Sequence, residues 1–154
     1  TFLMSFLLLE IILESIVEKE AVKSQCYDSI ASVFYNRLEN KFKLASCITV
    51  EYVLCYHRPF LTFTDIKTES PYNLYMNNGL APTPFCFVIQ EVLDAVQNPI
   101  KTDLRYFVYD WTNHRIYFAT TDSIHNINAD RARANYIQKF GKENIRKKHF
   151  GNFY

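Results

Sequence analysis

The chain has 154 residues, of which 49% are hydrophobic and 21% are charged, and its formal net charge at pH 7 is +1. This length and composition predict one globular domain with its own core and exclude a disordered chain. The small net charge argues against a nucleic-acid-binding protein, because nucleic-acid-binding surfaces carry a clear basic excess. The one basic cluster, Arg146–His149, is interpreted as a solvated tail.

The sequence pattern predicts a mainly helical α+β fold, with residues 1–154 forming a single domain. Apolar residues at intervals of three and four predict helices, and two aromatic, β-branched segments around a polar turn predict a β-hairpin. The expected helices are Phe6–Lys23, Ser24 or Tyr27 to Asn40, a short one from near Thr49 to Tyr56, Phe85–Gln97 and Asp122–Phe140, and the expected strands are Arg105–Tyr109 and Arg115–Ala119. The segment Arg58–Pro84 holds four of the five prolines and is expected to be a long functional loop.

The N-terminal segment from Phe2 to Val17 is nearly all apolar, but Glu10 and Glu14 interrupt it and no basic residue precedes it. It is also shorter than a membrane-spanning helix requires, so it is expected to be a buried core helix. Because the chain opens abruptly at Thr1, we expect an upstream segment that is absent from this sequence.

The four cysteines are Cys26, Cys47, Cys55 and Cys86, and no pair has the two-residue gap of a zinc site. Buried thiols are the default expectation, and one or two disulfides remain open if the compartment is oxidising. No metal site and no cofactor are predicted.

Glu18 is the first candidate for chemistry. On a helix, its neighbours three and four positions away are Glu14, Ser15, Ala21 and Val22, and none of them is basic. Apolar surroundings and a nearby carboxylate both raise a carboxyl pKa, which makes a glutamic acid available as a proton donor near neutral pH.

Glu20 differs from Glu18 because Lys23 lies three residues further on and can pair with it. This contrast selects Glu18 as the candidate acid. The alternative is that Glu10, Glu14 and Glu18, which step by four, form the solvated stripe of an amphipathic helix.

Eight short sequence islands then occur in one order along the chain. They are Ser15–Glu20, Ala31–Leu38, Leu44–Ser46 with Thr49–Val50, Ser70–Tyr75, Gly79–Pro82, Asn98–Pro99 with Lys101–Thr102, Tyr106–Val108 and His125–Asn126. Together, from about Leu13 to Tyr136, they resemble the YceG-like family of endolytic murein transglycosylases.

The resemblance implies a bacterial cell-envelope enzyme that works at the periplasmic face of the inner membrane, anchored by one N-terminal transmembrane helix. The anchor and a small peptidoglycan-binding lobe are expected to be absent here, so this chain would be the catalytic portion. The implied substrate is the peptidoglycan glycan strand, the cell-wall synthesis machinery is a further partner, and nucleic acid is not a partner. In the family, the first Glu of the Ser-Ile-Val-Glu-Lys-Glu island is catalytic, which here is Glu18.

The implied reaction cleaves the bond between N-acetylmuramic acid and N-acetylglucosamine without water and leaves a 1,6-anhydro ring. One carboxyl group suffices as acid and then base, and its pKa is expected to be raised towards about 6. The candidate substrate-binding residues are Tyr72, Asn73 and Tyr75 in the aromatic loop, together with Asn36, Ser46 and Thr49. Asn36 and its neighbour Arg37 could equally brace the helices, Ser46 and Thr49 could cap the short helix, and His125 is interpreted as structural.

The chain departs from the family pattern at two places. Ala45–Thr49 replaces a run that usually contains an amide and an acid, and Ala81–Ile89 lacks the expected glycine. The alternative function is therefore a divergent, catalytically weak wall-binding or scaffold module. A third possible function is ordinary hydrolysis of the glycan strand. This reaction needs a second carboxylate, for which Asp28, Asp65 and Glu69 are available.

Overall fold

The structure is a computed structural model that describes residues 2–21 and 26–150. It confirms the predicted α+β class: the described residues form five α-helices, two short 3-10 helices and one two-stranded antiparallel sheet. In chain order these are α1 (Phe2–Glu20), α2 (Tyr27–Glu39), α3 (Cys47–Leu54), a 3-10 helix (Asp65–Lys67), α4 (Gln90–Gln97), β1 (Tyr106–Asp110), β2 (Arg115–Ala119), α5 (Asp122–Phe140) and a second 3-10 helix (Lys142–Asn144).

The core forms where α1 meets α2 and α4. Ile16 and Val17 of α1 are completely buried, and so are Ile30 of α2 and Val96 of α4. The prediction that the apolar N-terminal segment is a core helix is therefore confirmed for the second half of α1. No helix in the described part of the chain is long and apolar enough to cross a membrane.

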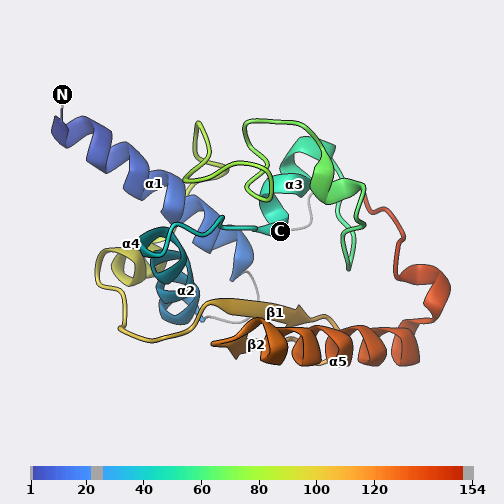
Figure 1. Ribbon diagram of the computed structural model, residues 1–154. Coiled ribbons are helices and arrows are strands. Elements are labelled where there is room, and N and C mark those ends of the chain that lie inside the picture. Colours follow the sequence, from blue (N-terminus) through green and yellow to red (C-terminus); the bar gives the residue numbers. More distant parts are fainter. Residues whose placement is uncertain (1, 22–25, 151–154) are drawn as a thin grey trace.

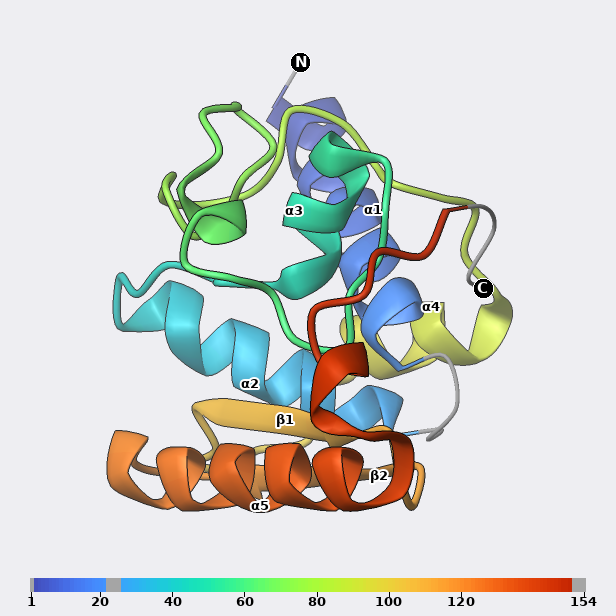
Figure 2. The same cartoon turned by 90° about the vertical axis from the view of Figure 1, so that its right-hand side faces the viewer.

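The hairpin of β1 and β2 lies between α2 and α5 (Figures 1 and 2). Phe34 of α2 meets Phe107 of β1 edge to face, with ring centroids 5.7 Å apart. Tyr106 pairs with Ala119 at one end of the sheet and Asp110 with Arg115 at the other, so the predicted hairpin is confirmed with a one-residue shift in β1.

Helix α5 has the predicted bounds because the residues at its two ends, Thr121 and Gly141, start and stop the helix as expected. The Thr121 side chain accepts a hydrogen bond from the backbone N–H of Ile124, and the positive φ of Gly141 (89°) ends the helix. The prediction for α4 was wrong at its N-terminus: the helix begins at Gln90 rather than at Phe85. The backbone N–H groups of Phe85 and Ile89 donate instead to side chains of α1, which holds that stretch outside the helix.

Two further predictions about the third helix and the cysteines need correction. Helix α3 begins at Cys47 rather than near Thr49, with Ser46 as an extended N-cap residue. All four cysteines are free thiols, but none is buried, since two are half-buried and two are exposed. The predicted extension of the first helix to Lys23, and the pairing of Lys23 with Glu20, lie outside the described residues.

Candidate active site

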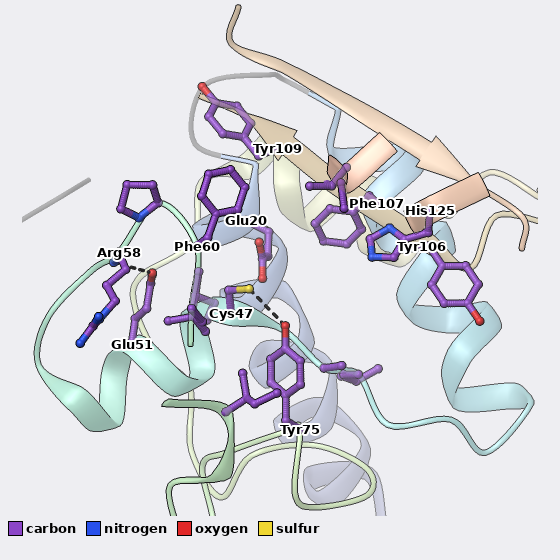
Figure 3. A pocket seen from close by; sticks show the side chains of 18 of the residues that line it. Glu20, Cys47, Glu51, Arg58, Phe60, Tyr75, Tyr106, Phe107, Tyr109 and His125 are labelled. Atoms are coloured by element: carbon purple, nitrogen blue, oxygen red, sulfur yellow. Dashed lines mark hydrogen bonds between the residues drawn. The ribbon is translucent and has the colours of Figure 1, made fainter. Parts of the chain in front are cut away.

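A cavity of about 460 Å³ opens between the C-terminal end of α1, the N-terminal end of α3, the hairpin and the first turns of α5 (Figure 3). Its walls are largely aromatic. The aromatic lining residues are Phe60, Tyr75, Tyr106, Phe107, Tyr109 and Trp111. Such rings present flat apolar faces with polar edges, which suits the packing of sugar rings.

Glu20, the last residue of α1, carries its carboxylate into this cavity (Figure 3). Ser46 donates a hydrogen bond to Glu20 Oε1 over 2.5 Å, and so Ser46 does not cap its own helix with its side chain. The carboxylate of Glu20 therefore lies at the N-terminus of α3, where unsatisfied backbone N–H groups and the helix dipole favour negative charge.

The pKa of Glu20 is raised from 4.5 to about 7. Burial is the largest cause, because it penalises the charged form, and the charge of Glu51 acts in the same direction. Hydrogen bonds from Ser46 and from the backbone of Ile48 and Cys47 oppose the rise. The net result is a carboxyl group that exchanges its proton near neutral pH, as an acid–base catalyst must.

Glu18, the acid predicted from the sequence, does not line the cavity. Each residue of an α-helix is rotated by about 100° from the one before it, so positions i and i+2 are about 200° apart. Glu18 and Glu20 therefore point to nearly opposite sides of α1. The Glu18 Oε2 atom accepts a hydrogen bond from the backbone N–H of Ile89 at 3.1 Å. The alternative of a solvated acidic stripe also fails, because the next member, Glu14, is 1% exposed.

Of the six predicted substrate-binding residues, Tyr75 alone lines the cavity, where its hydroxyl lies 3.2 Å from Cys47 Sγ. Ser46 contributes through its hydrogen bond to Glu20. Tyr72 packs against Tyr52 on another part of the surface, with ring centroids 5.2 Å apart.

The remaining three hold the framework of the site rather than lining it. Asn36 donates to the carbonyl oxygens of residues 102 and 104 and so ties α2 to the segment before β1. Thr49 is fully buried and donates to the carbonyl of Ser46. Asn73 is also fully buried, and its amide donates to the carbonyls of Ile66 and Thr68 in the long loop.

Sequence reasoning missed two further carboxylates that line the cavity, Glu51 and Asp122. Glu51 is the one beside a histidine. It lies one turn after Cys47 on α3, and its Oε1 atom is 2.6 Å from Nδ1 of His57. The i, i+4 spacing of Cys47 and Glu51 would have placed both on one face of α3, once the start of that helix was known. The carboxylates considered from the sequence, Asp28, Asp65 and Glu69, do not line the cavity.

Within the described residues, no cluster of three or more His, Cys, Asp or Glu residues is arranged to hold a metal ion. The side chains of the cavity offer a carboxyl group near its titration point, a second carboxylate beside a histidine, a third carboxylate at Asp122, and an aromatic wall.

Comparison with known proteins identifies the family of this chain. The model of the YceG-like family matches residues 9–131, which include most of α1, all of the cavity lining except Arg133, and the start of α5. The chain belongs to the YceG-like family. The resemblance carried by the eight islands is thus confirmed.

Two curated relatives of this YceG-like chain are named endolytic murein transglycosylase. The protein from Bacillus subtilis (strain 168) is 37% identical over 123 residues, which cover 80% of this chain and 33% of the relative. The protein from Streptococcus pneumoniae serotype 2 (strain D39) is 34% identical over 119 residues, which cover 74% of this chain and 22% of the relative. The YceG-like chain therefore spans about a third or less of the length of these relatives.

A solved structure shows the same fold. The crystal structure of a YceG-like protein from Listeria monocytogenes superposes with a TM-score of 0.67 at 37% sequence identity, over 75% of this chain and 38% of that one.

Proposed function

We propose that this chain carries the catalytic portion of an endolytic murein transglycosylase, which cleaves the bond between N-acetylmuramic acid and N-acetylglucosamine without water, and that Glu20 is its acid and base. The observation that carries the proposal is the position of Glu20, a carboxyl group with a pKa of about 7 that faces an aromatic cavity. The names of the relatives supply the substrate class.

The cleavage needs two proton transfers, both of which pass through one carboxyl group. Protonated Glu20 gives its proton to the glycosidic oxygen as the bond from C1 of the muramic acid residue to that oxygen breaks. The resulting carboxylate then takes the proton of the C6 hydroxyl of the same sugar, whose oxygen bonds to C1 and closes a 1,6-anhydro ring. A carboxyl group near its titration point performs both steps at neutral pH.

The surroundings of Glu20 support both steps. Burial favours its protonated form before cleavage, while Ser46 and the N-terminus of α3 stabilise the carboxylate that cleavage produces. Two further carboxylates line the cavity, Asp122 and Glu51, and Glu51 lies beside His57. The proposed reaction uses neither, because the C6 hydroxyl of the sugar takes the place of the water or nucleophile that hydrolytic glycosidases use.

The cellular setting follows from the same proposal. The substrate is the peptidoglycan glycan strand, the site of action is the periplasmic face of the bacterial inner membrane, and the cell-wall synthesis machinery is the expected partner. This setting is proposed from the family membership of the chain.

The test is the mass of the products. Purified peptidoglycan is incubated with this chain and with Glu20→Gln, which keeps the size and the hydrogen-bond acceptor of the side chain but has no proton to exchange. The proposal expects fragments one water lighter than hydrolysis products from the unaltered chain alone. Fragments with ordinary reducing ends would indicate hydrolysis, and a folded chain that binds the wall but releases nothing would indicate the divergent wall-binding module.

A further inference from the structure

A second polar feature of the cavity is not used by the acid–base chemistry of Glu20. Arg37 of α2 and His125 of α5 both line the cavity, and both pack against Tyr106 of β1. The guanidinium carbon of Arg37 lies 5.1 Å from the centroid of the Tyr106 ring. The His125 imidazole stacks on the same residue, with centroids 5.3 Å apart and an interplanar angle of 25° (Figure 3).

The guanidinium of Arg37 is held in a fixed orientation. Its Nε donates to the carbonyl of Arg105 over 2.6 Å, and its Nη1 donates to the carbonyls of Leu44, over 2.6 Å, and of Lys43, over 3.3 Å. Its Nη2 makes no hydrogen bond within the described part of the chain. Because a guanidinium group carries five N–H donors, the N–H groups of Nη2 remain unused. Arg37 therefore lines the cavity with a permanent positive charge and unused hydrogen-bond donors.

The two nitrogens of the His125 imidazole differ in their surroundings. Nδ1 is buried and has no hydrogen-bond partner among the described residues. Burial and the nearby charge of Arg37 lower the pKa of His125, although Asp122 acts in the opposite direction. Because orphaned buried N–H groups are rarer than orphaned acceptors, we infer that the neutral ring carries its proton on Nε2 rather than on the buried Nδ1.

We propose that Arg37 and His125 form a carboxylate subsite in the cavity, which recognises the lactyl group that distinguishes N-acetylmuramic acid from N-acetylglucosamine. The proposal rests on the proposed function, since it assumes that a glycan strand occupies the cavity. The two N–H groups of Arg37 Nη2 are left to donate to a carboxylate, since Nε and Nη1 already donate to backbone carbonyls, and the Nε2–H group of His125 would add a further donor. No group of N-acetylglucosamine carries a negative charge, so the subsite would place the muramic acid residue beside Glu20.

Two carboxylates of the wall share this chemistry. One is the lactyl carboxylate of strands from which the stem peptides have been removed. The other is the terminal carboxylate of a stem peptide, in strands where the lactyl group has become an amide. The experiment must therefore compare both kinds of strand with a glycan that has neither.

Trp111 makes the experiment direct, because it is the single tryptophan of the chain and it lines the cavity. The Glu20→Gln form is used so that the ligand is not consumed, and its fluorescence is titrated with a peptide-free tetrasaccharide of alternating N-acetylglucosamine and N-acetylmuramic acid. Chitotetraose is the matched ligand without carboxylates, and the peptide-bearing tetrasaccharide is the third. We expect the peptide-free strand to bind at least about tenfold more tightly than chitotetraose, as for hydrogen bonds to a charged group.

Substitutions of His125 then separate recognition from packing. His125→Phe keeps the stack on Tyr106 but has no donor, and we expect it to weaken binding of the peptide-free strand about tenfold and to leave chitotetraose binding unchanged. His125→Gln can place an amide N–H near the position of Nε2 and is expected to recover part of the affinity. Asn126→Ala, a change at the exposed next residue, is the control and should bind like the parent.

Each outcome of these titrations supports or overturns the proposed subsite. Tighter binding of the peptide-bearing strand would assign the subsite to the stem-peptide carboxylate. Equal binding of chitotetraose and the peptide-free strand would overturn the subsite and leave the proposed function standing, and so would a His125→Phe variant that weakens both equally. Failure of all three glycans to bind the folded chain would overturn both proposals. If His125→Phe does not fold, the comparison of the three ligands on the Glu20→Gln form still decides.

Discussion

The half-buried carboxyl group of Glu20 should lower the stability of the fold when it is ionised. The pKa of an ordinary glutamate side chain is 4.5, and the pKa of Glu20 in the folded chain is about 7. This difference corresponds to about 3 kcal/mol of unfolding free energy. A folded-state pKa above the unfolded value means that the folded chain binds the proton more tightly. The stabilisation is therefore complete below about pH 4.5 and is lost as the pH rises through about 7.

Glu20→Gln removes this dependence because the amide does not titrate in this range. We expect the unfolding free energy of the parent, relative to that of Glu20→Gln, to fall by about 3 kcal/mol between pH 4.5 and pH 8. Urea unfolding of both proteins at several pH values, followed by tryptophan fluorescence, measures the difference directly. A difference that stays constant within about 0.5 kcal/mol across this range would refute the buried, proton-holding state of Glu20, since it would indicate equal pKa values in the two states.

Three further predictions concern the reaction and the framework. The rate of strand cleavage should fall as the pH rises above about 7, because Glu20 must be protonated to act as an acid, and a rate that rises through pH 8 would contradict this. Glu51→Gln should move that fall to lower pH, since the charge of Glu51 helps Glu20 to hold its proton, and a pH–rate profile measures the shift. Asn73→Ala should lower the unfolding free energy by about 2–4 kcal/mol because it strands two loop carbonyls, and an urea midpoint like that of the parent would argue against this role.

Much of the fold could be predicted from local patterns. The hairpin and helix α5 were predicted almost to the residue because aromatic strand segments, a capping threonine and a terminating glycine act over a few neighbouring residues. The N-terminus of α4 could not be predicted in this way. Its start is set by hydrogen bonds from Phe85 and Ile89 to α1, about 70 residues earlier in the chain.

The same limit explains why Glu18 was selected from the sequence. The residues three and four positions away define the surroundings of a helical side chain only if no other element contacts it. Glu20, at the end of α1, contacts the N-terminus of α3 and lines the cavity. The sequence suggests Lys23, a local neighbour, as a partner for Glu20, and that pairing lies outside the described residues. A partner that the structure does show, Ser46, is 26 residues away and is predicted from the sequence as a substrate or capping residue.

Asn36, Thr49 and Asn73 show the reverse case. Their positions in the sequence islands suggested contact with substrate, but their side chains bind backbone carbonyls of the loops that shape the site. A sequence pattern shows that such residues matter without showing whether they contact the ligand or hold the groups that do, because only the tertiary contacts distinguish these roles.

The assignment of the acid is tested most directly by the rate at which anhydro ends form from purified peptidoglycan at pH 6.5, compared for the parent, Glu18→Gln and Glu20→Gln. We predict that Glu20→Gln loses activity by at least about 100-fold, the usual contribution of a positioned general acid, and that Glu18→Gln retains most of it, because its amide oxygen still accepts from Ile89. Loss of activity in Glu18→Gln with full activity in Glu20→Gln would contradict the account.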